Sequence, residues 1–525
     1  MAAHPDPFPW RTPCLAALLV WAGLLGGFSA AQAIDNDQGL FYLAALRVAQ
    51  GQVFMVDFGM PYAYFTVQVL AFFIWLAPTS GWGLVLASGA LNLAAVWVVF
   101  LLIDRTGAGR WATLAGAWLT SLGFLAIGGM YYNDQFAYFF VFLAGLVFTA
   151  HWRLGVKCLL TSFCLIVAFY AKQTVGLAGA AGLGAAWLLT SGWQRASFQT
   201  ALYLIGSYLL GHLLLLGWVY FFLDFELFTF FYFDLPRDYK ADLSIWEVAK
   251  AFLFPLRIDP IQMLAERGLG RLLLYPFVLL CYYAYFLIGT KNLGPVSRPP
   301  NLNFRFLLIY GLVSSLIGNG LIGRGNLELN LGLGMVAALV LATVSRPWLR
   351  DSGLILFTAI LVLFIFKDRR LAEPSNAQQL ADSELRPLVL RRLFAQKDDS
   401  LFHALNREVY DFLRAQPVGY TLATVDRIGY LVPLALGNAP VVMTTDYLHA
   451  FHYLPVASPL REYAEADLIR RYEQFQPDFV LTTVRQPNDP EGFQPGALAR
   501  FDAYLVQHYH SVYLHNYYQV LARKK

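Results

Sequence analysis

Long apolar segments alternate with short polar connections over the first two thirds of the chain. Eleven of these segments approach the length of about 20 residues that a helix needs to cross the hydrocarbon core of a bilayer. They cover residues 13–33, 82–103, 111–129, 136–151, 158–172, 174–190, 199–222, 271–289, 304–322, 329–344 and 351–366. A further apolar segment, 63–76, spans only roughly 20 Å at about 1.5 Å per residue. It is therefore predicted to lie in the membrane interface, or to re-enter, rather than to cross.

The pattern changes at about Lys367 to that of a soluble domain. Apolar runs at 440–443 and 479–483 predict strands, and the stretch 462–475 predicts a helix between them. We therefore expect an all-α polytopic membrane protein of about eleven transmembrane helices in residues 1–366. A small soluble α/β domain is expected to follow in residues 367–525.

Composition agrees with this architecture. The chain is 58% hydrophobic and only 14% charged, whereas soluble domains carry about a quarter charged residues. The net charge of +4 is spread over short loops, which argues against nucleic acid as a partner. The four cysteines have no metal-type spacing, so neither disulfides nor zinc are expected. The sequence at 31–33 also fits a signal-peptidase site, but a retained first helix is favoured because a long apolar array follows.

The distribution of lysine and arginine predicts the topology. If the N-terminus is cytoplasmic and 63–76 does not cross, the basic residues of five loops fall on the inner side, which is the positive-inside pattern. This arrangement predicts a multi-pass protein, for which we expect a bacterial inner membrane, with the C-terminal domain in the periplasm. The inner residues are Arg105, Arg110, Arg153, Lys157, Arg195, Lys291, Arg298, Arg305, Arg346 and Arg350.

The same topology places several ionisable residues together on the outer face. Carboxylates at a bilayer edge are costly unless they are used, so their gathering on one side predicts a polar site beside the membrane. The residues expected there are Asp35, Asp37, Asp57, Asp134, Lys172, Gln173 and Arg324, with Arg237 and Lys240 in a long loop, 223–270.

Three motifs in this order resemble a known superfamily. The first loop opens with an Asp-Asn-Asp sequence, continues from Gly39 to Gly51, and returns through Asp57 and Pro61; the later motifs are Tyr132-Asn-Asp-Gln-Phe136 and Ala171-Lys-Gln-Thr174. Residues 1–190 in this respect resemble the GT-C membrane glycosyltransferases, such as lipid A aminoarabinose transferases and protein O-mannosyltransferases. Those enzymes have an acidic pair where this chain has Asp-Asn-Asp, and matching the two glycines favours Asp37 over Asp35.

The resemblance implies transfer of a sugar from a polyprenyl-phosphate-linked donor to a lipid, glycan or protein acceptor on the extracytoplasmic face. Such a transfer needs a base for the acceptor and cations for the departing phosphate. Asp37 is the expected base, with Asp35 as the alternative and Asp134 orienting the acceptor or sharing the proton. Donor phosphate or substrate would be bound by Lys172, Gln173, Arg324, Asp57, Arg237 and Lys240. Whether Asp35, Asp37 and Asp134 hold a divalent cation, magnesium or manganese, stays open.

Each assignment has a structural alternative. Asp35 or Asp37 could cap the helix expected to start near Gly39, and Asp134 could cap the helix from Phe136. Lys172 could extend toward the interface, as lysines near helix ends commonly do. Two other functions also stay open, namely a transporter or flippase of a lipid-linked or polar solute, and a non-catalytic assembly subunit. The clustering of charges at membrane edges, rather than at mid-bilayer depth, favours the enzyme.

Overall fold

The computed structural model describes most of the helices and part of the C-terminal region. The residues it describes are 11–30, 36–61, 63–77, 81–126, 133–191, 195–239, 275–289, 302–322, 332–369, 408–417, 419–425, 432, 436, 442–443, 458–483, 498–514 and 518–525. They fall into two compact units. The first joins residues 1–30, 85–215 and 243–374, and the second joins 31–84, 216–242 and 375–525.

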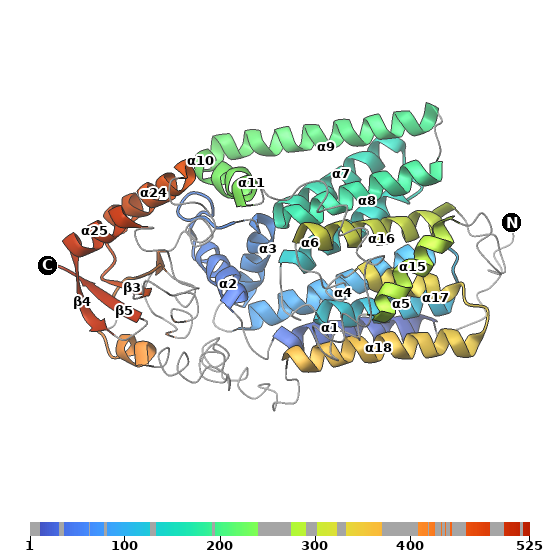
Figure 1. Ribbon diagram of the computed structural model, residues 1–525, viewed down its shortest axis with the longest axis horizontal. Helices are drawn as coiled ribbons and strands as arrows, with labels where there is room; N and C mark the ends of the chain where they lie inside the picture. Colours follow the sequence, from blue (N-terminus) through green and yellow to red (C-terminus); the bar gives the residue numbers. More distant parts are fainter. Residues whose placement is uncertain are drawn as a thin grey trace. The chain divides into compact units, whose positions relative to one another are not determined.

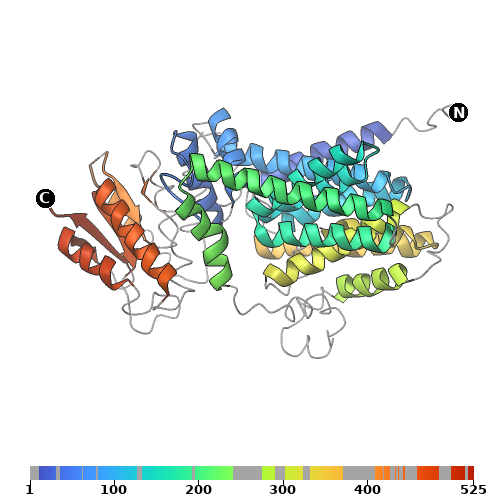
Figure 2. The ribbon, with the colours of Figure 1, turned by 90° about the horizontal axis from the view of Figure 1, so that it is seen from above.

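The first unit is a bundle of apolar helices that run alongside one another (Figures 1 and 2). Every segment predicted to cross the membrane coincides with a helix. The helices are α1 (Arg11–Ala30), α4 (Trp82–Asp104), α5 (Arg110–Ala126), α6 (Asn133–Phe148), α7 (Leu154–Ala171), α8 (Gln173–Ser191), α9 (Arg195–Phe222), α15 (Tyr275–Gly289), α16 (Leu302–Ile322), α17 (Gly332–Ala342) and α18 (Pro347–Arg369). The end of α9 and the start of α4 extend into the second unit.

Among the described residues, four helices are both long and apolar enough to cross a membrane, namely α4, α7, α8 and α9. In the 18-residue apolar window of α9, within Ser197–Phe222, only 6% of the residues are buried. Its exposed side chains include Leu209, Leu213 and Phe221. A surface of this kind is stable in lipid but not in water. The chain is therefore an integral membrane protein, while the number of about eleven spans stays a prediction.

Small residues let α8 and α16 pack closely. An added Cβ at Gly182 would contact the Ser314 side chain and would lie 3.0 Å from the Ser314 backbone nitrogen and 3.1 Å from the Tyr310 oxygen. The hydroxyl of Tyr310 donates a hydrogen bond to the Val141 carbonyl at 2.6 Å, which ties α16 to α6. Close approach at glycine is a common way to join helices where lipid removes the hydrophobic driving force between them. The interface of α6, α8 and α16 is therefore intolerant of added volume.

We expect Gly182→Val to destabilise the bundle by about 1–3 kcal/mol, because the new side chain overlaps the α16 backbone. Gly184→Val is the matched control, since a Cβ there meets nothing within 4 Å. Thermal unfolding of the purified protein in detergent should show a lower transition temperature for the first variant than for the second. Equal temperatures would contradict the packing at Gly182.

The second unit contains α2 (Asn36–Ala49), α3 (Tyr64–Leu76), α10 (Phe225–Thr229), the π-helical turn η1 (Phe230–Asp234), α11 (Leu235–Tyr239), α24 (Pro459–Phe475) and α25 (Ala499–His508). Residues 408–414 are helical as well. The prediction of a short helix at 63–76 is confirmed by α3, which has 13 residues. Its exposed residues Phe72, Trp75 and Leu76 are apolar. Its predicted place in the membrane interface stays a prediction.

The C-terminal residues form a five-stranded sheet in the order β2-β1-β3-β5-β4. The strands are β1 (Leu422–Thr424), β2 (Val442–Met443), β3 (Phe479–Thr483), β4 (Tyr509–Leu514) and β5 (Tyr518–Arg523). The first three pair in parallel, and β5 is antiparallel to β3 and β4. The helices α24 and α25 lie on one face of this sheet (Figure 2). The predicted strands at 440–443 and 479–483 and the helix at 462–475 are confirmed within the described residues.

The set of chain segments that makes up the second unit was not expected from the sequence. Its residues 31–84 and 216–242 come from the part of the chain that was assigned to the membrane domain. The contacts group these segments with the sheet and its helices rather than with the helical bundle. The boundary between a membrane domain, 1–366, and a soluble domain, 367–525, stays a prediction.

Candidate functional site

A buried ion pair lies where three helices of the first unit end or begin. Asp134 is the second residue of α6, and Lys172 is the single extended residue between α7 and α8. The Lys172 Nζ lies 3.5 Å from the Asp134 Oδ1, and the side chains are 18% and 9% exposed. Gln173, predicted as a ligand, is the first residue of α8. The structure thus brings together three of the residues that the sequence singled out.

The position of Asp134 explains why a charge is tolerated there. The first turn of α6 places its helix dipole beside the carboxylate, which favours negative charge. The Lys172 ammonium offsets the cost of removing that charge from water. The Asp134 backbone N–H donates to the Asn133 Oδ1 at 3.0 Å, so Asn133 supplies a local cap. Whether the Asp134 carboxylate also caps the first turn of α6 stays open.

Polar atoms around this pair have unused hydrogen-bonding capacity. Within the described residues, the Asn133 Nδ2 and the Thr174 Oγ1 are buried and have no hydrogen-bond partner, while the Asp134 Oδ1 lies 3.5 Å from the Lys172 Nζ. Buried polar groups are nearly always satisfied in folded proteins. The Asn133 amide and the Thr174 hydroxyl, beside a largely buried ammonium, are suited to contacts with a polar or anionic group.

The structure describes only some of the other predicted site residues. Asp35, Lys240 and Arg324 lie outside the described residues. Asp37 is the second residue of α2, which begins at Asn36 and not near Gly39 as expected. Asp37 and Asp134 belong to different units, so their proximity stays a prediction. Among the described residues, no group of three His, Cys, Asp or Glu side chains could hold a metal ion, and the predicted set of Asp35, Asp37 and Asp134 stays untested.

Arg237 lies on the surface of the second unit. Its side chain is 70% exposed and lies 3.7 Å from Asp234 and 3.2 Å from Asp238. Exposed pairs of this kind contribute little stability. Arg237 and Asp134 belong to different units, so the role of Arg237 as a phosphate ligand stays a prediction.

Asp57 closes a compact loop after α2. Its Oδ2 accepts a hydrogen bond from the Val53 N–H at 2.7 Å, and its own N–H donates to the Val53 carbonyl at 2.9 Å. The Met55 N–H donates to the Phe58 carbonyl at 2.7 Å. Met55 has a φ of 64° and Gly51 a φ of 94°. The loop 51–61 is thus built from its own hydrogen bonds, and the Asp57 carboxylate is part of that framework.

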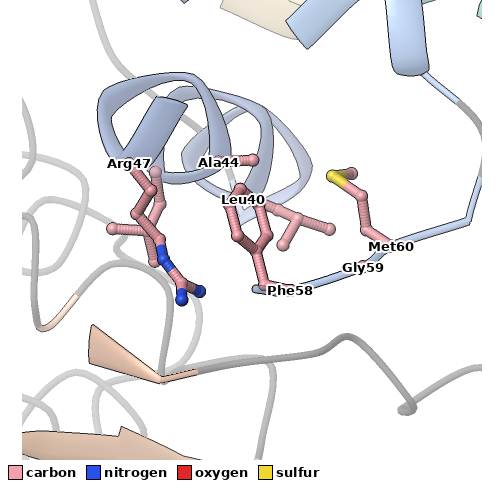
Figure 3. Close-up of a pocket in the computed structure, with 7 residues that line it drawn as sticks. Leu40, Ala44, Arg47, Phe58, Gly59 and Met60 are labelled. Atoms are coloured by element: carbon pink, nitrogen blue, oxygen red, sulfur yellow. The ribbon is translucent and has the colours of Figure 1, made fainter. Parts of the chain in front are cut away.

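Arg47 joins this loop to α2. Its guanidinium donates to the Gln52 side chain and lies 4.0 Å from the centre of the Phe58 ring. Figure 3 shows Arg47 and Leu40 extending from α2 toward Phe58 and Met60. These residues line a small open hollow together with Leu43, Ala44 and Gly59. Burial lowers the pKa of Arg47 to about 9, Arg471 acts in the same direction and Asp57 opposes both, so the guanidinium stays charged at neutral pH.

Segments distant in sequence contact the same loop within the second unit. The Asp224 N–H donates to the Met55 carbonyl at 2.9 Å, and the Tyr64 N–H donates to the Tyr232 hydroxyl at 2.8 Å. From α24, the Arg471 Nη1 donates to the Asp57 carbonyl at 2.8 Å. Neither Arg47 nor Arg471 was predicted to belong to a site. Arg47 does stand out in the sequence, because it is one of the few basic residues expected on the outer side, together with Arg324.

Tyr463 of α24 lies in an acidic setting beside the 224–232 segment. Its ring centre is 5.3 Å from that of Phe230. Burial raises the pKa of Tyr463, and the carboxylates of Asp467, Asp224 and Glu226 raise it further. The phenol is therefore protonated at neutral pH.

Comparison with known proteins gives only distant matches. No protein family model and no curated protein sequence matches the chain. Its structure is similar to that of ArnT from Cupriavidus metallidurans bound to undecaprenyl phosphate, at 12% identity, 98% coverage of both chains and a TM-score of 0.39. It is also similar to the Archaeoglobus fulgidus oligosaccharyltransferase tethered with an acceptor peptide, at 12% identity, 98% of this chain, 74% of that chain and a TM-score of 0.44.

A third similar structure is the arabinofuranosyltransferase AftD from Mycobacteria, at 12% identity, 98% of this chain, 40% of that chain and a TM-score of 0.43. Two of these three structures are named as an oligosaccharyltransferase and an arabinofuranosyltransferase. Similarities of this degree do not by themselves identify a reaction or a substrate. The role of each residue has to be argued from this chain.

Proposed function

We propose that the protein is a membrane glycosyltransferase of the GT-C type. It transfers a sugar from a polyprenyl-phosphate-linked donor to a lipid, glycan or protein acceptor on the extracytoplasmic side of the membrane. The observation that carries the proposal is the buried pair of Asp134 and Lys172, 3.5 Å apart at the ends of membrane helices. Two of the three motifs behind the family resemblance contribute one residue each to this pair.

The pair is suited to holding an anionic leaving group. A desolvated ammonium acts strongly on charge that develops nearby, because little water screens it. Asp134 holds the Lys172 side chain, while Asn133 and Thr174 carry buried polar atoms without a hydrogen-bond partner in the described part of the chain. A donor phosphate bound there would gain an ammonium and further polar contacts. Arg324 is proposed to add a second cation.

The proposed transfer forms one bond, breaks another and moves one proton. The acceptor oxygen or nitrogen attacks the anomeric carbon of the sugar, and the bond from that carbon to the phosphate oxygen breaks with its electron pair left on the phosphate. The acceptor proton passes to a carboxylate, for which we propose Asp37. Base catalysis of this kind contributes about 10²–10⁴-fold to a rate. Lys172 stabilises the negative charge that collects on the departing phosphate.

Deletion of the gene is expected to remove one sugar from a surface lipid, glycan or glycoprotein of the cell. Mass spectrometry of these fractions would show the loss as a fixed mass difference, which also identifies the sugar and the class of acceptor. Reintroducing the intact gene should restore the modified species, and a gene carrying Lys172→Met should not. Identical surface glycans in the presence and absence of the gene would contradict the proposed function.

A further inference from the structure

The side chain of Arg471 connects the C-terminal helix α24 to the loop that follows α2. Its Nη1 donates to the Asp57 carbonyl at 2.8 Å and lies 3.5 Å from the Val56 carbonyl. The side chain is only 5% exposed. A buried guanidinium that binds two successive backbone carbonyls fixes the course of the chain there, because its donors have a rigid fork geometry. The contact joins residues 414 positions apart in the sequence.

The charge of Arg471 is compensated on its own helix. Its Nε lies 2.6 Å from the Asp467 Oδ2, one turn earlier on α24, and the Asp467 side chain is 2% exposed. Arg470 donates to the other carboxylate oxygen. Asp467 is held by two arginines, and its contact with the Arg471 Nε orients the Arg471 guanidinium toward the loop. If Arg471 were removed, Asp467 would still pair with Arg470.

The loop transmits this contact to α2. Hydrogen bonds from Val53 to the Asp57 carboxylate and from Met55 to Phe58 make residues 53–58 a single folded turn. The Phe58 ring lies against the Arg47 guanidinium, and Arg47 is anchored on α2. Asp37 lies on the same helix, three turns before Arg47.

A second contact of α24 supports the same loop from another direction. The Tyr463 ring packs against Phe230. The segment that carries Phe230 also supplies the Asp224 N–H to the Met55 carbonyl, and its Phe231 and Leu227 side chains approach Gly59 closely. One helix of the C-terminal region thus contacts the loop 51–61 directly and through the segment 224–231.

We propose that Arg471 is a positioning residue for the outer loop, so that the C-terminal helix α24 holds α2, the helix that carries Asp37, in the position needed for sugar transfer. The expected effect on sugar transfer rests on the proposed function. The expected effect on the structure of the loop does not depend on it. Arg471 touches no substrate in this scheme and acts through the backbone of Val56 and Asp57.

Hydrogen exchange of the full-length protein in lipid nanodiscs tests the effect on the loop without any substrate. Arg471→Met is expected to speed amide exchange in residues 53–58 by about tenfold or more, the factor for losing one hydrogen bond to a charged group. Arg523→Met is the matched control. Its guanidinium also contacts a carboxylate, Asp478, at 3.6 Å and donates to a carbonyl, that of Gln476, at 2.9 Å, but both lie in the C-terminal region.

The proposal would be overturned if amide exchange at 53–58 is unchanged in Arg471→Met. It would also be overturned if exchange there is equally fast in Arg523→Met. If Arg471→Met does not fold, Arg471→Lys takes its place, because a lysine keeps a charge beside Asp467 but lacks the fork that reaches the carbonyls. Where transfer is measured, the variant should lower kcat about tenfold or more and leave the donor KM within a small factor. A protein without transferase activity would refute the proposed function and leave the exchange test valid.

Discussion

Replacing Lys172 with methionine is expected to lower kcat for sugar transfer by about 10²–10³-fold, the range for losing one group that stabilises charge in a transition state. Methionine has a similar length and fits a buried site, so the change removes the charge with little change of volume. The measurement is steady-state transfer by purified protein in nanodiscs over a range of donor concentrations, with the donor identified from the deletion strain. The donor KM should rise as well, because the ammonium would also contact the phosphate of the bound donor.

Loss of activity in Lys172→Met alone would not separate catalysis from folding. The substitution leaves Asp134 buried without the ammonium that lies 3.5 Å away, which costs about 3–5 kcal/mol in comparable cases. The double variant Asp134→Asn with Lys172→Met removes both charges and should recover much of the stability. We expect it to be folded and inactive. Full transfer by a stable double variant would mean that the pair is only structural.

Lys157→Met is the matched control for this experiment. Lys157 lies near the opposite end of the same helix, α7, where its Nζ is 5.1 Å from the centre of the Phe148 ring. Its removal should leave transfer unchanged. Thermal unfolding of all three proteins then separates a general loss of α7 stability from an effect at Lys172.

The helices could be predicted from sequence because lipid imposes a simple rule on them. A spanning segment must be long, apolar and helical, so its hydropathy and length locate it within a few residues. The start of α2 was predicted less well because the polar residues Asn36 to Gln38 carry no apolar periodicity, yet they form its first turn. Asp134 and Lys172 could be singled out because charges beside apolar helices are rare.

The contacts of the second unit could not be predicted in the same way. Asp467 and Arg471 are spaced i and i+4 on a polar helix, a pattern that usually indicates a pair in solvent. Only the folded chain shows that this pair is buried against the carbonyl of Asp57. Asp57 was itself interpreted as a substrate ligand, since sequence does not reveal that its carboxylate accepts from Val53. When two contacting residues lie hundreds of positions apart, a single sequence contains no spacing that reveals the contact.

Replacing Asp37 with asparagine is expected to lower transfer by about 10²–10⁴-fold, the contribution of a general base. The helix itself should persist, because the loss of one negative charge from the first turn of α2 costs only about 0.3–1 kcal/mol. The wild-type rate should rise with pH as the base loses its proton, and this rise should be absent from the residual rate of Asp37→Asn. The measurement is a pH–rate profile at saturating donor.

Two further asparagine variants make the assignment of the base specific. Asp35→Asn distinguishes the two carboxylates of the first loop: if it abolishes the pH-dependent rise while Asp37→Asn keeps it, then Asp35 is the base. Asp351→Asn controls for the loss of a carboxylate elsewhere, since Asp351 is 51% exposed and lies 3.1 Å from Arg350 on α18. A charge at the membrane edge is costly unless it is used, which favours a base in this loop. Transfer at the wild-type rate in both Asp35→Asn and Asp37→Asn would show that neither carboxylate takes the acceptor proton.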